Sequence, residues 1–319
     1  MFADDTSVLQ SGSSICDLNT RLNRSASEVS AWANMNKMAL NTTKTKSILI
    51  TTHQKIHFLQ DPSLNIIVDG NSIEQVNDAK LLGVTLDCHL TWDKHIKNIC
   101  SIVKGRLALL RRIKPFLSHN CTLRFYNSCI HNHLIYCSSA WGNCSLSSLT
   151  RLLRLQKRAA RIILDADFSQ SSVSLFSKLK WLPIFHLIKF RKLILLFSIV
   201  NNPDVPLCLK QMFNFLSSIR SAGPRTRACA FDLKVPFPRS NSGKRTFAYC
   251  AATLFNCLDP DLKQLVSHSP STISFSSSLT SFKLKLRNLF LQFFHNIDHF
   301  EELMCYACRF SLQCNCITR

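Results

Sequence analysis

Apolar side chains recur every three or four positions between Ile15 and Met35, and this spacing predicts an amphipathic helix. Ser13 or Ser14 can cap its N-terminus, and we expect it to end near Asn41. In the flanking segments, apolar and polar residues alternate or apolar residues form short runs, and both patterns are typical of strands. These runs cover residues 1–3, 8–9, 46–52, 64–68 and 81–84, with turns expected at residues 4–7 and 69–70. The first third is therefore predicted to be a small α+β unit.

From Thr91 onward the apolar pattern keeps a helical period. One stripe ends at Pro115, which cannot continue a helix, and a second helix is predicted at residues 146–164. The remaining segments predict a helix at 175–201, loops and short strands at 220–245, a serine-rich linker at 267–281 and a last helix at 282–294. The fold class that we expect is α+β, with a second part that is mainly helical.

Charge is unevenly placed along the chain. Residues 1–93 carry 7 basic and 10 acidic side chains, residues 94–164 carry 13 basic and no acidic ones, and residues 165–319 carry 19 and 9. The middle stretch cannot neutralise itself through local ion pairs, because it has no carboxylate. It therefore requires a polyanion, and nucleic acid and an anionic membrane surface are the two candidates.

The cations of this middle stretch lie mostly off the apolar stripes of its two helices. A single basic helix face is more often a solvated surface, but two such faces without any acid favour contact with phosphates. Such contacts would not depend on base sequence, because cations on backbone phosphates position a duplex without reading it. The residues are Lys94, Lys97, Lys104, Arg106, Arg111, Arg112, Lys114, Arg151, Arg154, Lys157, Arg158 and Arg161.

The sequence argues against a membrane-spanning protein and against a secreted one. The longest apolar stretch, residues 182–200, is interrupted by one histidine and three cations, so we do not expect it to span a membrane. Asp4 and Asp5 lie where a signal peptide would need a basic region and an apolar core. Fifteen cysteines, an odd number, indicate reduced thiols in an intracellular protein of the nucleus, the cytoplasm or both.

Two adjacent carboxylates, Asp4 and Asp5, are placed at the first predicted turn. Like charges this close are unfavourable unless a cation lies beside them. Two-metal phosphoryl transfer uses such carboxylates to hold divalent ions against a nucleoside triphosphate. Taken alone, an Asp-Asp pair is more often an ordinary turn.

The context of the pair is more specific. Phe2-Ala3-Asp4-Asp5 resembles the aromatic-x-Asp-Asp hairpin of reverse transcriptases, and the residues that follow resemble the non-LTR (LINE-type) retrotransposons of the jockey and CR1-like kind. The order and spacing of the motifs together are specific, and they cover nearly the whole chain. The matching segments are Trp32 with Asn36, Leu40-Asn41, Lys44-Thr45, Lys80 to Asp87, Leu90-Thr91-Trp92, His95-Ile96, Tyr126, Ile130, Tyr136, Trp141-Gly142, Leu155 to Ala159, Trp181 to Ile184 and Gly243 to Leu258, with Phe255 before Asn256 where the family usually has Trp.

This resemblance implies RNA-templated DNA synthesis with Mg²⁺ or Mn²⁺, an RNA template, a DNA primer or target duplex and dNTP. It assigns Asp4 as the principal metal ligand, Asp5 as its neighbour, and Lys44 as a catalytic lysine near the leaving pyrophosphate. It also implies that the turn at Leu82 and Gly83 holds the primer end. The nucleic-acid-binding residues that we predict are Lys80, Leu82, Gly83, Lys104, Arg106, Arg111, Arg112, Arg154 and Arg158.

The resemblance divides the chain into a partial polymerase palm at 1–93, a basic helical thumb at 94–165 and a C-terminal retrotransposon region at 166–319. In the family, the fingers, the first catalytic aspartate and the endonuclease domain lie upstream of the Asp-Asp hairpin. We therefore expect a fragment of the polymerase that does not catalyse synthesis unaided. The alternatives are a catalytically dead nucleic-acid-binding remnant and a module that binds anionic membranes through its basic helices.

The cysteine-rich tail presents half of a zinc site. Its C-x-x-C pair has the usual spacing, whereas the following C-x-C pair fits less well, so reduced thiols in a terminal tail are the stronger expectation. The residues concerned are Cys305, Cys308, Cys314 and Cys316, with His295 and His299 nearby. His131 and His133 are read as packing or surface histidines rather than metal ligands.

Overall fold

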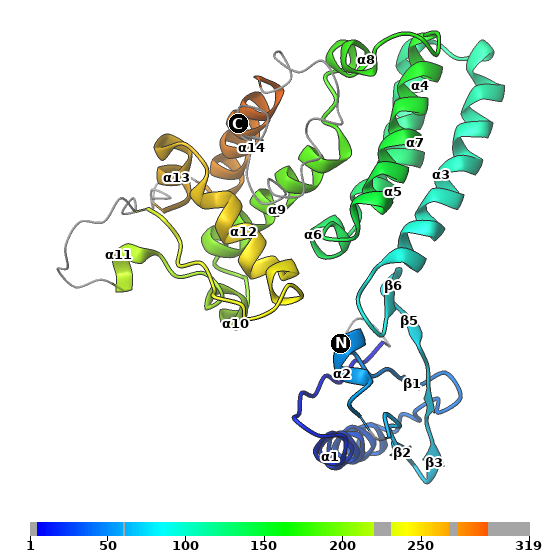
Figure 1. The fold of residues 1–319 in the computed structure, drawn as a ribbon, viewed down its shortest axis with the longest axis vertical. Helices are drawn as coiled ribbons and strands as arrows, with labels where there is room; N and C mark the ends of the chain where they lie inside the picture. The colour runs from blue at the N-terminus through cyan, green and yellow to red at the C-terminus, as the bar shows by residue number, and fades with distance from the viewer. Residues whose placement is uncertain (1–4, 60, 220–230, 268–273, 293–319) are drawn as a thin grey trace. The chain divides into compact units, whose positions relative to one another are not determined.

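The computed structural model describes residues 5–59, 61–219, 231–267 and 274–292. The chain divides into two compact units, residues 1–95 and residues 96–319, which are described separately (Figure 1). The first unit combines helices with short strands, and the second is helical apart from one isolated β-bridge among its described residues. The predicted α+β class is therefore confirmed.

Helix α1 (Ile15–Met35) is the longest element of the first unit. Its N-terminus is capped by Ser14, whose hydroxyl accepts a hydrogen bond from the backbone N–H of Asp17 at 3.2 Å. The helix ends at Asn36, and Lys37 follows in the left-handed region at φ 56°. The end predicted near Asn41 was therefore wrong, because this left-handed residue terminates the helix earlier.

The strands predicted at 46–52 and 64–68 are shorter in the structure, and the run predicted at 81–84 spans the turn between two strands. β1 (Lys46–Ser47) pairs in parallel with β4 (Glu74–Gln75), and β2 (Ile67–Val68) pairs antiparallel with β3 (Asn71–Ser72) across the predicted turn at Asp69 and Gly70. β5 (Asp78–Leu81) and β6 (Val84–Asp87) form a second hairpin, and α2 (His53–Ile56) is a single turn. Val8 and Leu9 form no strand, which corrects the prediction for that segment.

The core of the first unit lies between α1 and the β2–β3 hairpin. Two asparagines of α1 complete it by hydrogen bonding to strand backbone. Asn23 donates to the carbonyl of Asn65 and accepts from the N–H of Ile67, both at 2.8 Å, and Asn19 accepts from the N–H of Asn65 at 3.0 Å. These amides satisfy the edge of the hairpin that no strand covers. The buried residues are Leu64, Ile66, Val68 and Ile73, with Leu18, Leu22, Ala26, Leu40 and Leu49 packed against them.

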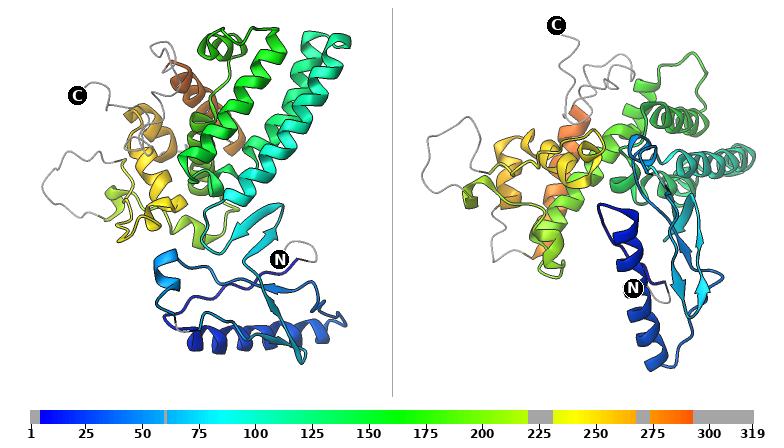
Figure 2. Two further views of the ribbon diagram at one scale, coloured as in Figure 1. Left: turned by 45° about the vertical axis from the view of Figure 1, so that its right-hand side comes forward. Right: turned by 60° about the horizontal axis from the view of Figure 1, so that its bottom comes forward.

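The second unit begins within α3 (Asp93–Ile113), which a 3₁₀ turn, η1 (Lys114–Phe116), follows. A continuous helical stretch follows, made of α4 (His119–Phe125), the π-helical turn η2 (Tyr126–His131) and α5 (Asn132–Ile135). Figures 1 and 2 show α3 lying beside this stretch. The separate helices α6 (Ser138–Trp141) and α7 (Leu146–Leu164) come next. The helix predicted at 146–164 is therefore confirmed.

The rest of the second unit is arranged around α9 (Ile184–Asn201), which contacts α5, α6, α7, α10, α12, α13 and α14. Buried aromatic rings fill this core, and Tyr126 of η2 stacks on Trp181 with ring centroids 4.0 Å apart. The other elements are α8 (Ser172–Leu179), α10 (Leu207–Lys210), α11 (Leu216–Ile219), η3 (Gly243–Arg245), α12 (Phe247–Asn256), α13 (Pro260–Ser267) and α14 (Phe275–Gln292).

Two predictions for the second unit were wrong in their boundaries. The helix expected at 175–201 is broken, because Lys180 adopts φ 51° at the end of α8 and Pro183 precedes α9. The serine-rich segment 267–281 is not a linker over its described end, since α14 starts at Phe275 rather than at Phe282. Among the described residues, no helix is both long and apolar enough to cross a membrane.

Asn256, which follows Phe255 in the resemblance, holds the segment before η3 in place. Its side-chain amide accepts from the backbone N–H of Leu233 and donates to the carbonyl of Leu233, both at 2.9 Å. The side chain thereby forms with Leu233 the two hydrogen bonds that a residue of a neighbouring strand would form. This pairing explains why an asparagine is suited to the last position of α12.

Candidate nucleic-acid interface

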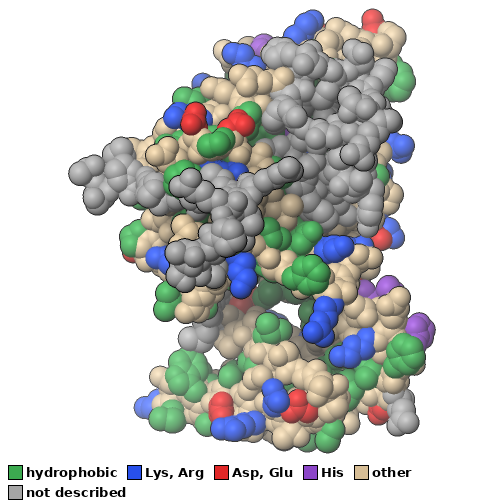
Figure 3. All heavy atoms as spheres, turned by 60° about the vertical axis from the view of Figure 1, so that its left-hand side comes forward, with side chains coloured by type: hydrophobic (Ala, Val, Ile, Leu, Met, Phe, Trp, Pro, Cys, Tyr) green, Lys and Arg blue, Asp and Glu red, His purple; other side chains and the backbone are tan. Residues whose placement is uncertain are grey.

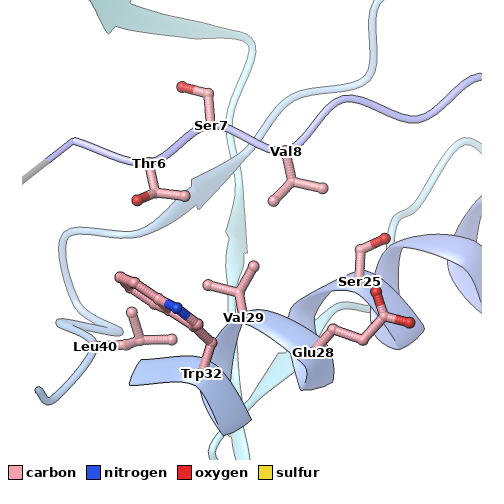
Figure 4. Close-up of a pocket in the computed structure, with 8 residues that line it drawn as sticks. All are labelled: Thr6, Ser7, Val8, Ser25, Glu28, Val29, Trp32 and Leu40. Carbon is pink, nitrogen blue, oxygen red and sulfur yellow. The ribbon is translucent and has the colours of Figure 1, made fainter. Parts of the chain in front are cut away.

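The predicted carboxylate pair is only partly within the described residues. Asp4 lies outside them, and Asp5 is exposed. The next three residues, Thr6 to Val8, line an open cavity of about 420 Å³ whose opposite wall contains Trp32 and Leu40 (Figure 4). The structure therefore brings the segment after the carboxylate pair close to the end of α1 and to the residues that precede Lys44.

The described residues that line this cavity do not form a metal site. Its walls are mainly apolar, and its one carboxylate, Glu28, forms an ion pair with Arg24 at 3.1 Å. Across the part of the chain that the structure describes, no three His, Cys, Asp or Glu side chains form a group that could hold a metal ion. The described donors thus do not by themselves fit a two-metal centre. The four tail cysteines of the predicted zinc site lie outside the described residues, as do His295 and His299.

Lys44 lies in a turn that Asn41 organises. The Asn41 side-chain oxygen accepts from the hydroxyl of Thr43 at 2.7 Å and from the backbone N–H of Lys44 at 3.1 Å, and its carbonyl accepts from the hydroxyl of Thr45 at 2.8 Å. These bonds fix the backbone and leave the Lys44 side chain exposed. An exposed ammonium on a fixed turn is suited to contact a phosphate group.

The β5–β6 hairpin has a two-residue turn at Leu82 and Gly83, with φ values of 45° and 82°. Both values are left-handed, as in the type I′ turn whose twist matches paired strands. Glycine adopts this conformation freely, but for leucine it costs roughly 1–2 kcal/mol. A hydrophobic residue that is 42% exposed therefore occupies the tip under strain, and Lys80 is exposed two residues before it. Backbone strain of this kind concentrates at functional sites.

A tight joint connects this hairpin to α3, and Asp87 is at its centre. Its carboxylate accepts hydrogen bonds from three backbone N–H groups, those of His89 at 3.1 Å, Thr91 at 2.9 Å and Trp92 at 2.7 Å. Burial alone would raise the pKa of Asp87, but these hydrogen bonds outweigh it and lower the pKa. Leu90 and Trp92 both adopt left-handed backbone within this short segment, at φ 50° and 68°.

Two further contacts hold β5 and β6 to the first turn of α3. The buried ring of His95 accepts a hydrogen bond at Nδ1 from the backbone N–H of Thr85 at 3.3 Å. Burial lowers the pKa of His95, so the neutral ring that this bond requires is favoured. Lys94 forms an ion pair with Asp78 of β5.

In the second unit, α3 turns one flank of cations toward solvent. Lys97, Lys104 and Arg111 are spaced by seven residues, so they lie on one side of the helix, and all three are exposed, as is Arg112. Arg106 differs from this group. It is half-buried, and its guanidinium donates to the carbonyl of Cys129 at 2.7 Å, so it connects α3 to η2.

The cations of α7 all lie on the face opposite its buried leucines, isoleucines and alanines. Arg154 and Arg158 are exposed, whereas Arg161 donates to the carbonyls of Phe168 and Gln170 at 3.2 and 3.4 Å and has a structural role. Lys114, at the end of α3, forms an ion pair with Asp165. The structure therefore separates the predicted cations into exposed ones and ones that hold the helices together.

Cys100 of α3 is influenced by cations of both helices. Burial raises the pKa of this thiol, and the positive charges of Arg151 on α7 and Lys104 on α3 oppose the rise. Residues 94–164 contain no carboxylate, so no acid within this stretch neutralises the cations of the two helices. We call these cations, all exposed except the half-buried Arg151, the α3–α7 surface: Lys97, Lys104, Arg111, Arg112, Arg151, Arg154 and Arg158.

Asp87 and Asn41 have structural roles that were not predicted from the sequence, although both belong to segments that carry the resemblance. Their roles depend on backbone N–H groups two to five residues away, which spacing alone does not reveal. A short polar residue directly before a turn was the available signal. Figure 3 shows Lys and Arg side chains spread over the face it draws, with fewer acidic ones among them.

Comparisons with known proteins confirm the resemblance. The chain is similar to three Drosophila melanogaster proteins. It is 26% identical over 189 residues to the probable RNA-directed DNA polymerase from transposon X-element and 26% identical over 170 residues to the probable RNA-directed DNA polymerase from transposon BS. It is 28% identical over 170 residues to the RNA-directed DNA polymerase from mobile element jockey. The matches cover 52–58% of this chain but only 18–20% of those proteins. No protein-family model matches the chain, and no solved structure matches it.

Proposed function

We propose that this chain supplies the primer-holding and duplex-binding parts of the RNA-directed DNA polymerase of a non-LTR retrotransposon. Residues 1–93 would be a partial palm, residues 94–165 the thumb and residues 166–319 the C-terminal region. The observation that carries the proposal is the α3–α7 surface, a set of cations that are exposed apart from Arg151 and have no carboxylate in their stretch of the chain, in a protein similar to three mobile-element polymerases.

The α3–α7 surface would bind the phosphates of a template–primer duplex. Each cation that neutralises a phosphate releases condensed counterions, so affinity falls as salt rises and depends little on sequence. A polymerase that copies any template needs contacts of this kind, because base-specific contacts would stop it at particular sequences. The proposal assigns this role to Lys104, Arg111, Arg112, Arg154 and Arg158.

The first unit would contribute the groups near the reacting end. Leu82 and Gly83 would hold the primer terminus, with Lys80 close by, and Lys44 would neutralise charge on the leaving pyrophosphate. Asp4 and Asp5 would take part in binding Mg²⁺ or Mn²⁺ together with groups from the rest of the polymerase. Bound metal would stabilise the charge that develops on the attacking and leaving oxygens.

The binding half of the proposal is tested with the 319-residue chain and fluorescent RNA–DNA duplexes at several salt concentrations. We expect log affinity to fall linearly with log salt, at about −0.9 per phosphate contacted. Reversing Arg111, Arg112, Arg154 and Arg158 to Glu should remove most of the affinity. The matched control reverses four exposed lysines elsewhere in the second unit, Lys178, Lys234, Lys283 and Lys285, and should retain most of it. A flat salt dependence, equal losses in both variants, or stronger binding to anionic vesicles than to duplexes would contradict the proposal.

The second candidate is a nucleic-acid-binding protein without chemistry, since the same cations would suffice for it. A chimera separates the two: the part of the jockey polymerase upstream of the Asp-Asp hairpin is fused before Met1 and assayed for primer extension on RNA. Under the polymerase proposal the chimera extends the primer, and Asp4→Asn abolishes extension while duplex affinity is unchanged. Extension that is indifferent to Asp4→Asn, or a folded chimera that binds but never extends, favours the second candidate.

A further inference from the structure

We infer that Asp87 is a positioning residue: by fixing the joint between the β5–β6 hairpin and the first turn of α3, it determines where the hairpin tip holds a primer end. The inference rests on the proposed function for the role of the tip. It concerns a residue that would touch neither primer nor nucleotide and that acts through backbone geometry.

The contacts of Asp87 show why this side chain controls the joint. Both carboxylate oxygens are used, one by the N–H groups of His89 and Thr91 and the other by the N–H of Trp92. The three donors come from four consecutive residues, so the carboxylate gathers the whole connection around itself. An ionised carboxylate forms stronger bonds to N–H groups than a neutral amide does.

The conformation that Asp87 holds is one that the connection would not adopt unaided. Leu90 and Trp92 are bulky residues at φ 50° and 68°, in the region where side chains other than glycine, asparagine and aspartate are uncommon. Strained backbone persists only where the surroundings over-determine it. In this joint the carboxylate supplies that constraint, and its removal lets both residues relax toward ordinary backbone.

Other contacts also hold the two ends of the joint, so relaxation at its centre would change the angle between the hairpin and the first turn of α3 as far as those contacts yield. On the hairpin side, the N–H of Cys88 donates to the carbonyl of Asn77 at 2.9 Å, and the carbonyl of Cys88 accepts from Thr51 at 2.9 Å. On the helix side, His95 accepts from Thr85. Three residues of strand separate Asp87 from Val84, where the turn begins, and they make a lever of about 10 Å, so a rotation of about 10° would move the start of the turn by about 2 Å. The geometry of the reacting groups tolerates only displacements that are smaller than this one.

The test uses the 319-residue chain and two RNA–DNA duplexes, one blunt and one with a recessed primer 3′ end. Asp87→Asn keeps the shape of the side chain but places an amide N–H against backbone donors. We expect the preference for the recessed end to fall roughly tenfold, as befits loss of charge-assisted hydrogen bonds, while affinity for the blunt duplex stays within about twofold. Hydrogen exchange of the amides of residues 89–92 should speed up in the same variant.

Asp69→Asn is the matched control. Asp69 also lies at a hairpin turn of the first unit in left-handed backbone, and it accepts a hydrogen bond from the hydroxyl of Ser30 at 2.6 Å. Loss of this hydrogen bond should lower the stability of the first unit without changing the preference for the recessed primer end. Leu90→Gly is the second variant, because it loosens the joint while relieving strain and so does not depend on the Asn variant remaining folded. It should lower the end preference in the same direction.

The outcomes distinguish this inference from the proposed function. Unchanged exchange and unchanged end preference in Asp87→Asn and Leu90→Gly overturn the positioning role, as does an equal loss in Asp69→Asn. Wild-type chain that binds duplexes without any end preference overturns both the role of the tip and the inference. Wild-type chain that binds no nucleic acid overturns the proposed function itself, and with it the positioning role of Asp87.

Discussion

Neutralising single cations on α3 should distinguish residues that contact phosphates from a residue that connects α3 to η2. The pair to compare is Lys104 and Arg106, two residues apart. Lys104 is exposed, whereas Arg106 is half-buried and donates to the carbonyl of Cys129 at 2.7 Å. The sequence presents them as equivalent members of one basic helix, and the structure does not.

The magnitudes follow from these contacts. Lys104→Ala should reduce the salt slope of duplex binding by about 0.9, so the variant loses about 3.5-fold less affinity than wild type when salt is raised fourfold. Its free energy of unfolding should change by less than about 0.5 kcal/mol, as for an exposed side chain. Arg106→Ala leaves a backbone carbonyl without its donor and should cost about 1–3 kcal/mol of stability, with a salt slope close to wild type.

Fluorescence anisotropy at four salt concentrations measures the slopes, and urea unfolding measures the stabilities. Arg154→Ala, on the exposed face of α7, repeats the Lys104 measurement on the second helix. The reasoning would be refuted if Arg106→Ala lowered the slope as much as Lys104→Ala did without any loss of stability. It would equally be refuted if neither Lys104→Ala nor Arg154→Ala changed the slope.

Three further predictions concern particular contacts. Burial lowers the pKa of His95, so the unfolded chain takes up a proton first as pH falls through about 6.5. The free energy of unfolding should therefore decline below that pH until the lower pKa of the native state is passed. His95→Gln should flatten this pH dependence, as measured by urea unfolding at pH 5–8. Leu82→Asn should raise the free energy of unfolding by about 0.5–1 kcal/mol, because asparagine tolerates left-handed backbone, while weakening the preference for a recessed primer end; a loss of stability would contradict the turn geometry. Asn256→Ala should destabilise the second unit by about 1–3 kcal/mol in thermal or urea unfolding, and an unchanged midpoint would mean that its two bonds to Leu233 contribute nothing.

Helices were predictable from sequence where a cap and an uninterrupted period coincide. For α7 the apolar spacing alone predicts residues 146–164, and in the structure Ser145 caps the helix by accepting from the N–H of Ser148. For α14 the same kind of cap is present, but the serine-rich composition predicts a linker. Ser274 accepts from the N–H of Ser277, and the serines of the first turns are exposed or half-buried, where polarity does not oppose a helix.

The candidate site was predictable to a smaller extent. Helical periodicity correctly placed the exposed cations of α3 and α7, because exposure follows from the opposite apolar stripe. It could not distinguish Arg106 from Lys104, since the carbonyl that Arg106 binds is 23 residues away in the chain. The joint around Asp87 was also beyond reach, because left-handed backbone at a leucine and a tryptophan is set by contacts and opposes local preference.

The π-helical turn η2 has a consequence for how this protein can vary in length. A π turn contains one residue more than the α-helical turn it replaces, and Tyr126 and Ile130 of this turn are both buried. Deleting one residue between them would return the turn to an ordinary α-helical one, so Leu134 of α5 would keep its buried position. A deletion elsewhere in the same helix would instead rotate everything after it by about 100°. Single-residue changes of length among related chains should therefore occur at η2 and in the segment between α7 and α8, and should avoid the rest of this helix.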